Sequence, residues 1–386
     1  MKIQPDRRLL IPKSFYLLYY GGMAALMPFL TLHYQGVGLS GREIGILIGL
    51  RPLVRLLGGP FWAAVADVSR RHKPLLLASL ALYLLSVYGI WQAQSFTALI
   101  ISGLAMAFFA APIDALVDSA VLGMPGDRRD AFGQQRLWGA VGWGLAAPLV
   151  GHLAETRGAS WHFYGFFLLM ALTIPVSSRL ETARMGRRVA FWRGVGTMAR
   201  NRWWALFLVT VFLAGLGRSA ASGFMNLHLD ALGAGRALIG IFATVGGLSE
   251  IPTFFYSGTL LRRWGARTLV LASLGGSLAM LLGFGWLTTP GLLVPLQLFH
   301  GPEFAAMYVA GVYYAGRAAP PGMEATARAL YGAVGALAMT LGGFVGGYLY
   351  DAVGALWLFR MAALMMAASM VFYLVTVRSG QDESPT

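Results

Sequence analysis

Two stretches of the chain, LHYQGVGLSGREIGILIG at residues 32–49 and LHLDALGAGRALIGIFAT at residues 227–244, are variants of one another. Ile44–Gly45–Ile46 aligns with Ile239–Gly240–Ile241 at a constant separation of 195 residues. Two weaker pairs follow in the same order, RLWGAVG with ALYGAVG and ETRGASW with DAVGALW. The sequence therefore predicts two homologous halves in parallel orientation, an arrangement found in membrane transporters.

The composition indicates an integral membrane protein. The chain has 386 residues, of which 57% are hydrophobic and 12% are charged, whereas soluble domains carry about 25% charged residues. Many apolar runs reach the roughly 20 residues that a helix needs to cross a bilayer. We therefore predict an all-α fold with twelve transmembrane helices in two pseudosymmetric six-helix bundles. The predicted spans are 11–34, 42–66, 74–93, 97–122, 137–155, 160–178, 203–230, 237–261, 268–288, 291–317, 329–351 and 355–378.

The halves are predicted at residues 1–178 and 203–386, the second ending in a short tail, with a basic cytoplasmic linker at 179–202. Basic residues collect on one set of loops, while the other set carries Arg42, Arg157 and Arg236. Because Lys and Arg accumulate on cytoplasmic loops, we expect both termini in the cytoplasm and the protein in the inner or plasma membrane.

Charge and cysteine content exclude several alternatives. The net charge of +14 fits basic cytoplasmic loops better than nucleic-acid binding. The chain has no cysteine, which excludes disulfides and thiolate metal sites. The basic N-terminus runs into an apolar span without a small-residue cleavage site, so we expect a retained first helix rather than a cleaved signal peptide.

Several motifs resemble the major facilitator superfamily. The loop motif Gly-x-x-x-Asp-Arg-x-Gly-x-Arg of that family is similar to GTLLRRWGARTL at 258–269, where Arg262 replaces the usual Asp. The first copy, AAVADVSRRHKP at 63–74, keeps fewer motif residues. The segments GGLSEIP and LQLFHGPEF, with FGQQRLWGAVGWG, resemble the branch of phenylpropionate permeases and lactose or nucleoside proton symporters. This resemblance implies import of small organic solutes with protons.

The resemblance also implies a cytoplasmic gating network of charged residues. Within it, Asp118 is expected to pair with Arg71 or Arg70. The expected gating residues are Asp67, Arg71, Asp118, Arg136, Arg263 and Arg267.

Three titratable residues in predicted spans are candidates for proton handling. Glu250 lies about 13 residues into the eighth span, hence roughly 20 Å from the outer surface, and the 195-residue shift maps it onto Arg55. His300 and Glu303 are three residues apart and so share one helical face. Ionisable side chains at this depth usually mark a substrate or proton path. The alternative for His300 and Glu303 is a structural interhelical hydrogen bond.

Candidate substrate ligands are Arg55, Arg218 and Asp114. Arg51 and Arg55 lie four apart on one face and need counter-charges or an anionic ligand. Pairing with Asp114 and direct substrate binding stay equally open for Arg55, whereas Arg51 is expected to be structural.

The favoured function is a secondary active transporter. We expect a proton-coupled symporter of a small organic solute, with an anion such as an aromatic carboxylate favoured, working by alternating access. Alternatives are proton-coupled efflux, sugar or nucleoside symport, a channel and a polytopic membrane enzyme. Short loops and the absence of a His-Glu-x-x-His motif argue against an enzyme. The chain has three lysines, none of them in a phosphate-binding Gly-rich loop, which argues against ATP-driven transport. The expected partners are a small-molecule substrate and the lipid bilayer, with no cofactor beyond the proton gradient, no nucleic acid and a monomeric state.

Overall fold

The computed structural model describes residues 7–122, 129–180, 198 and 201–377. Within these ranges the chain forms helices and no strands, and nine helical segments there are long and apolar enough to cross a membrane. The predicted all-α membrane fold is confirmed. The chain divides into two compact units, comprising residues 1–39, 50–186 and 234–244, and residues 40–49, 187–233 and 245–386.

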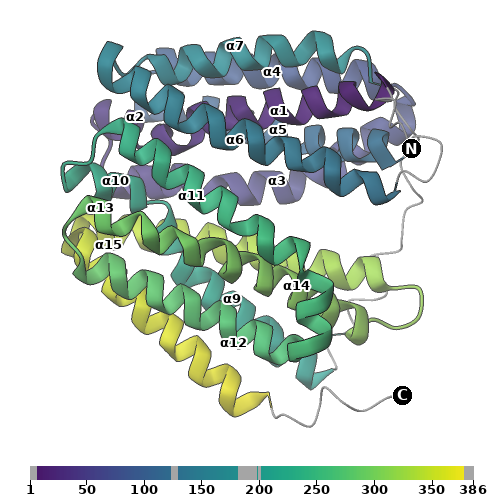
Figure 1. Cartoon of the computed structure of the whole chain (residues 1–386), viewed down its shortest axis with the longest axis vertical. Coiled ribbons are helices and arrows are strands. Elements are labelled where there is room, and N and C mark those ends of the chain that lie inside the picture. Colours follow the sequence, from purple (N-terminus) through teal and green to yellow (C-terminus); the bar gives the residue numbers. More distant parts are fainter. Residues whose placement is uncertain (1–6, 123–128, 181–197, 199–200, 378–386) are drawn as a thin grey trace, which may run out of the picture. The chain divides into compact units, whose positions relative to one another are not determined.

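Helices of the first half of the chain supply most of the first unit. In it α1 packs against α6 and α7, and α4 packs against α5 and α7 (Figure 1). Apolar and aromatic side chains fill its core, including the fully buried Phe15, Tyr19 and Phe166. The helical segments of this half are α1 (Arg7–Leu26), η1 (Met27–Phe29), α2 (Leu30–Gly36), α3 (Gly41–Ser69), α4 (His72–Gln92), α5 (Phe96–Leu122), α6 (Arg129–Arg157) and α7 (Trp161–Ser177).

The second unit is built mainly from the second half. Here α15 packs against α9 and α12, and α12 packs against α14 (Figure 1). The helical segments of this half are α9 (Arg202–Ser222), α10 (Met225–Ala231), α11 (Arg236–Phe255), α12 (Ser257–Trp286), α13 (Pro290–Leu293), η2 (Pro295–Phe299), α14 (His300–Ala318) and α15 (Glu324–Thr376).

The last two predicted spans lie in one continuous element, α15, which is broken at a single residue. α15 contains a sharp non-helical break at Gly354, with φ 79° and ψ 170°, a conformation open almost exclusively to glycine. The break lies between the predicted spans 329–351 and 355–378, so two helices follow one another there without a loop.

The tenth predicted span is interrupted. Instead of one helix over 291–317, the chain forms α13, then the 3₁₀ segment η2, and then α14 from His300 onward. Proline often kinks or breaks a helix at its own position. The structure places the break before Pro302, which lies in the first turn of α14, where proline is tolerated.

The units do not coincide with the predicted halves. The first residues of α3 group with the second unit, and the first residues of α11 group with the first. The predicted linker at 179–202 lies largely outside the described residues, and the division at 178 and 203 stays a prediction.

Candidate functional site

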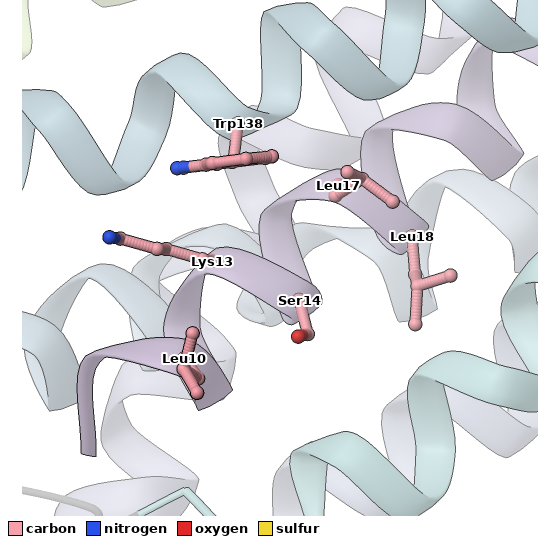
Figure 2. A pocket seen from close by; sticks show the side chains of 6 residues that line it. All are labelled: Leu10, Lys13, Ser14, Leu17, Leu18 and Trp138. Carbon is pink, nitrogen blue, oxygen red and sulfur yellow. The ribbon is translucent and has the colours of Figure 1, made fainter. Parts of the chain in front are cut away.

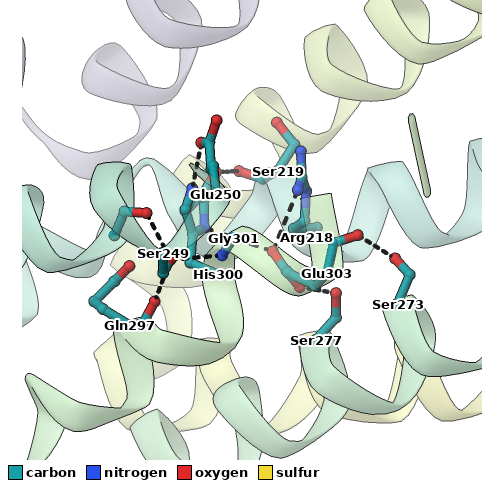
Figure 3. A network of polar contacts seen from close by, with 12 residues as sticks. Arg218, Ser219, Ser249, Glu250, Ser273, Ser277, Gln297, His300, Gly301 and Glu303 are labelled. Carbon is teal, nitrogen blue, oxygen red and sulfur yellow. Dashed lines mark hydrogen bonds and ion pairs between the residues drawn. The ribbon is translucent and has the colours of Figure 1, made fainter. Parts of the chain in front are cut away.

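Among the described residues of the second unit, the most deeply buried acid is Glu303, near the start of α14. Its side chain is fully buried. Arg218 of α9 donates from Nη1 to Glu303 Oε1 at 3.2 Å, and Ser277 Oγ of α12 donates to Oε2 (Figure 3). A further serine of α12, Ser273, donates to the Glu303 carbonyl at 2.6 Å. Three helices thus converge on one carboxylate, which compensates its loss of solvent.

His300 lies between two carboxylates. Its Nδ1 is 3.6 Å from Glu303 Oε1, and its Nε2 is 3.8 Å from Glu250 Oε1 of α11. Glu250 and His300 are partly exposed, with side-chain exposures of 30% and 33%. Figure 3 shows the resulting order, from the accessible Glu250 through His300 to the buried Glu303 and Arg218. The three predicted proton-handling residues are therefore neighbours, and we call them, with Arg218, the acid–histidine chain.

Arg218 is partly exposed and contacts an aromatic ring as well as Glu303. Its side chain is 29% exposed, and its guanidinium carbon lies 5.3 Å from the centre of the Phe304 ring. Phe254, Phe304 and Tyr308 form a contiguous aromatic group, with ring centres 5.9–6.4 Å apart. The predicted substrate ligand Arg218 thus joins the carboxylate to an aromatic surface.

The backbones of α11 and α14 touch beside this chain. A β-carbon at Gly301 would overlap the peptide joining Ser249 and Glu250, so glycine is required there. The Gly301 N–H donates to Ser249 Oγ at 2.8 Å.

Sequence reasoning did not find the serines of the site. Ser273 and Ser277 lie four residues apart, on one face of α12, but no signal in the sequence points that face at Glu303. Ser249 directly precedes Glu250 in GGLSEIP, which is the signal that could have marked it.

A second polar cluster lies in the first unit and contains Asp114, Asp118 and Arg136. Arg136 Nη1 of α6 lies 3.1 Å from Asp118 Oδ2, and Tyr16 donates to Asp118 Oδ1 at 2.6 Å. Tyr20 donates to Asp114 Oδ1 at 3.2 Å. Asp118 was expected to pair with a loop arginine. The structure pairs it with Arg136 instead, because α6 and α1 bring Arg136 and Tyr16 to the same face of α5.

The arginines of α3 differ in their surroundings. Arg51 donates to the Tyr34 hydroxyl at 2.8 Å, as fits a structural residue. Arg55 is exposed and near enough to Asp114 to interact with it electrostatically. This leaves both predicted roles of Arg55 open.

The remaining predicted gating residues flank turns. Asp67 and Arg71 lie on either side of the α3–α4 turn, where Arg70 adopts a φ of 53°. Arg263 and Arg267 lie on either side of Gly265, which has a φ of 73°. Their role in gating stays a prediction.

An open apolar cavity of about 260 Å³ lies between α1 and α6 in the first unit. Lys13 supplies its one charged group, and Trp138 covers part of it (Figure 2). None of its lining residues belongs to the acid–histidine chain. Among the described residues, no cluster of three or more His, Asp or Glu side chains is arranged to hold a metal ion.

Comparisons with known proteins place the chain in a family. The model of the MFS_1-like family matches residues 9–361. A maltose permease of Geobacillus stearothermophilus is 30% identical, with 89% of each chain covered. A probable 3-phenylpropionic acid transporter of Escherichia coli is 27% identical over 90% of this chain and 93% of its own. The crystal structure of the nucleoside transporter NupG superposes with a TM-score of 0.83 at 16% identity, covering 95% of this chain and 99% of that chain. The chain therefore belongs to the MFS_1-like family of major facilitator superfamily transporters.

Proposed function

We propose that the protein is a proton-coupled symporter of a small organic anion, working by alternating access in the inner or plasma membrane with both termini cytoplasmic. The observation that carries the proposal is the acid–histidine chain, in which a buried carboxylate is paired with a partly exposed arginine. Proton coupling, the anion and the monomeric state are our inference from that geometry and from the sequence.

Proton transfer along the acid–histidine chain changes the charge of Glu303, the carboxylate paired with Arg218. While Glu303 is ionised, Arg218 Nη1 is engaged with it at 3.2 Å. A proton that reaches Glu303 through Glu250 and His300 removes the negative charge. The guanidinium then has an unbalanced positive charge in a site of low dielectric, where electrostatic attraction is strong. Binding of an anion and binding of a proton are thereby coupled.

The aromatic group beside Arg218 favours an aromatic carboxylate. The substrate carboxylate would accept from Arg218 in a bidentate manner, while its ring packs against Phe304 or Tyr308. Tyr308 is 50% exposed and Phe254 is 37% exposed, so this surface is accessible. The name of the relative from Escherichia coli, a probable 3-phenylpropionic acid transporter, fits this substrate class.

Co-transport of a proton also removes an electrical penalty. An anion that enters against an inside-negative potential costs about 2.3 kcal/mol per charge per 100 mV. One proton per monovalent anion makes the cycle electroneutral. Symport of a neutral sugar is the second candidate, because the maltose permease is 30% identical to this chain.

Uptake into proteoliposomes tests the proposal. The purified full chain is reconstituted, an inward proton gradient is imposed, and accumulation of radiolabelled 3-phenylpropionate, maltose and uridine is measured with and without a protonophore. We expect protonophore-sensitive accumulation of 3-phenylpropionate. Accumulation of maltose or uridine alone contradicts the anion, and accumulation that survives the protonophore contradicts proton coupling. Uptake that occurs only under an outward proton gradient indicates proton-coupled efflux.

A further inference from the structure

The chain changes from a 3₁₀ to an α-helical path at His300. The Gln297 carbonyl accepts from the His300 N–H, three residues on, which is the 3₁₀ pattern. In a regular α-helix the same carbonyl would accept from the N–H of Gly301, four residues on. The N–H of Gly301 therefore needs another acceptor.

Ser249 of α11 supplies that acceptor. Its Oγ accepts from the Gly301 N–H at 2.8 Å and lies 3.0 Å from the Gln297 carbonyl oxygen. The Gly246 carbonyl, one turn back on α11, lies 2.7 Å away. Because a hydroxyl has one proton and two lone pairs, Ser249 accepts from Gly301 and donates to one of these two carbonyls. A side chain of α11 thus occupies the place of a backbone hydrogen bond (Figure 3).

This hydrogen bond joins the two backbone segments that carry Glu250 and His300 of the acid–histidine chain. Ser249 directly precedes Glu250, and Gly301 directly follows His300. The absence of a β-carbon at Gly301 brings its backbone against the Ser249–Glu250 peptide. The hydroxyl therefore fixes the position of the His300 backbone relative to the Glu250 backbone.

We propose that Ser249 is a positioning residue of the proton pathway, which holds the break between η2 and α14 so that the His300 ring lies between Glu250 and Glu303. The inference rests on the proposed function, since it assigns a role in proton coupling. Without the hydroxyl, the N–H of the buried Gly301 is left without its acceptor, and an unpaired buried backbone group is costly. It regains a bond if the segment winds into a regular α-helix with Gln297.

Such rewinding would displace His300. A residue turns about 120° around a 3₁₀ axis and about 100° around an α axis, so each rewound residue rotates by about 20°. The ring nitrogens lie 3.6 and 3.8 Å from the two carboxylates, at the limit of direct interaction. A small rotation is therefore enough to separate His300 from one of them.

Three substitutions test the role. Ser249→Ala removes the hydroxyl, and Ser249→Thr keeps it at a position that is partly exposed. Ser369→Ala is the matched control, because it removes another serine of the second unit whose hydroxyl links two helices, at 3.2 Å from the Thr210 carbonyl. Each variant and the parent are tested in proteoliposomes for gradient-driven accumulation of 3-phenylpropionate, maltose and uridine, and for exchange of whichever of these the parent accumulates. Hydrogen exchange of the amides at 297–303 is followed in the purified proteins.

We expect Ser249→Ala to lower gradient-driven accumulation by about tenfold or more, as small misplacements of reacting groups do. Substrate exchange and expression stay at parental levels. Hydrogen exchange of the backbone amides at 297–303 changes in this variant. Ser249→Thr and Ser369→Ala accumulate like the parent. A general packing role would lower exchange and accumulation together, and would overturn the inference.

The two proposals fail in different ways. If the parent shows proton-driven accumulation and Ser249→Ala matches it, the positioning role is wrong while the proposed function stands. If the parent accumulates none of the three probes in a protonophore-sensitive manner, the proposed function is contradicted. In that case unchanged hydrogen exchange at 297–303 in Ser249→Ala also rejects the structural role of the hydroxyl. Altered hydrogen exchange there would support the structural role but not a role in proton coupling.

Discussion

The ion pair of Glu303 and Arg218 is expected to contribute to the stability of the folded protein. Removing one partner of a buried pair leaves the other uncompensated, at a cost of about 3–5 kcal/mol in soluble proteins. We expect Arg218→Gln to lower the unfolding temperature of the purified protein, followed by tryptophan fluorescence. Arg218→Gln combined with Glu303→Gln should recover most of the loss. The exposed Arg328→Gln serves as control, and equal destabilisation by the single and the double variant would show that the pair is not coupled.

Glu250 is the accessible end of the acid–histidine chain, and its substitution tests proton entry. Glu250→Gln keeps the shape of the side chain but removes the group that takes up the proton. We expect loss of gradient-driven net transport, while exchange of substrate across the membrane survives because exchange needs no net proton movement. Glu43→Gln, at the start of α3 and outside the acid–histidine chain, is the control. Undiminished accumulation in Glu250→Gln at normal expression refutes the role.

Part of the acid–histidine chain could be predicted from the sequence alone. The spacing of His300 and Glu303 predicts that both lie on one helical face, and the 3.6 Å between His300 Nδ1 and Glu303 Oε1 agrees with it. The contact of His300 with Glu250 depends on how α11 packs against α14, and the contact of Glu303 with Ser277 depends on α12. Periodicity describes one helix at a time, so it contains no information on these partners.

At the scale of elements, hydrophobicity predicted where helices lie but not where they break. The run at 291–317 begins with mostly apolar residues and reads as one span, yet it forms α13, η2 and α14. Its division depends on Ser249, a side chain of another helix, which replaces a backbone hydrogen bond. The boundary at Gly354 was placed correctly because glycine and charge mark it in the sequence.

The break at Gly354 gives a prediction for α15. A side chain at φ 79° and ψ 170° is strained by about 1–3 kcal/mol. Gly354→Ala should therefore lower the unfolding temperature. Gly335→Ala lies in the same element with no atom within 4 Å of the added β-carbon, so it should be neutral or stabilising by up to about 1 kcal/mol. Similar unfolding temperatures for both variants would mean that the backbone at 354 relaxes without cost.

At the scale of the whole molecule, the sequence repeat reappears as a pair of equivalent helix caps. Asp351 accepts from the N–H groups of Gly41 and Arg42, at 2.7 and 2.9 Å, at the start of α3. Glu155 accepts from the Ala237 N–H at 2.8 Å, at the start of α11. The two acids occupy equivalent places in ETRGASW and DAVGALW. Each satisfies N–H groups that a helix start leaves unpaired and interacts favourably with the helix dipole.

These caps allow a test of concerted motion, because the repeat supplies equivalent reporters. Ile44 and Ile239 lie one turn inside the capped ends and are 1% and 0% exposed, and the chain contains no other cysteine that would react. Loss of a cap costs about 1 kcal/mol, which corresponds to an increase of about fivefold in an opened population. If the protein works by the proposed alternating access, the two caps open together. We therefore expect Asp351→Ala, like Glu155→Ala, to raise maleimide labelling of both Ile44→Cys and Ile239→Cys by about that factor, with Glu324→Ala as the control. Labelling that rises only at the reporter beside the substituted cap would show that each helix end frays on its own, and would argue against a concerted change.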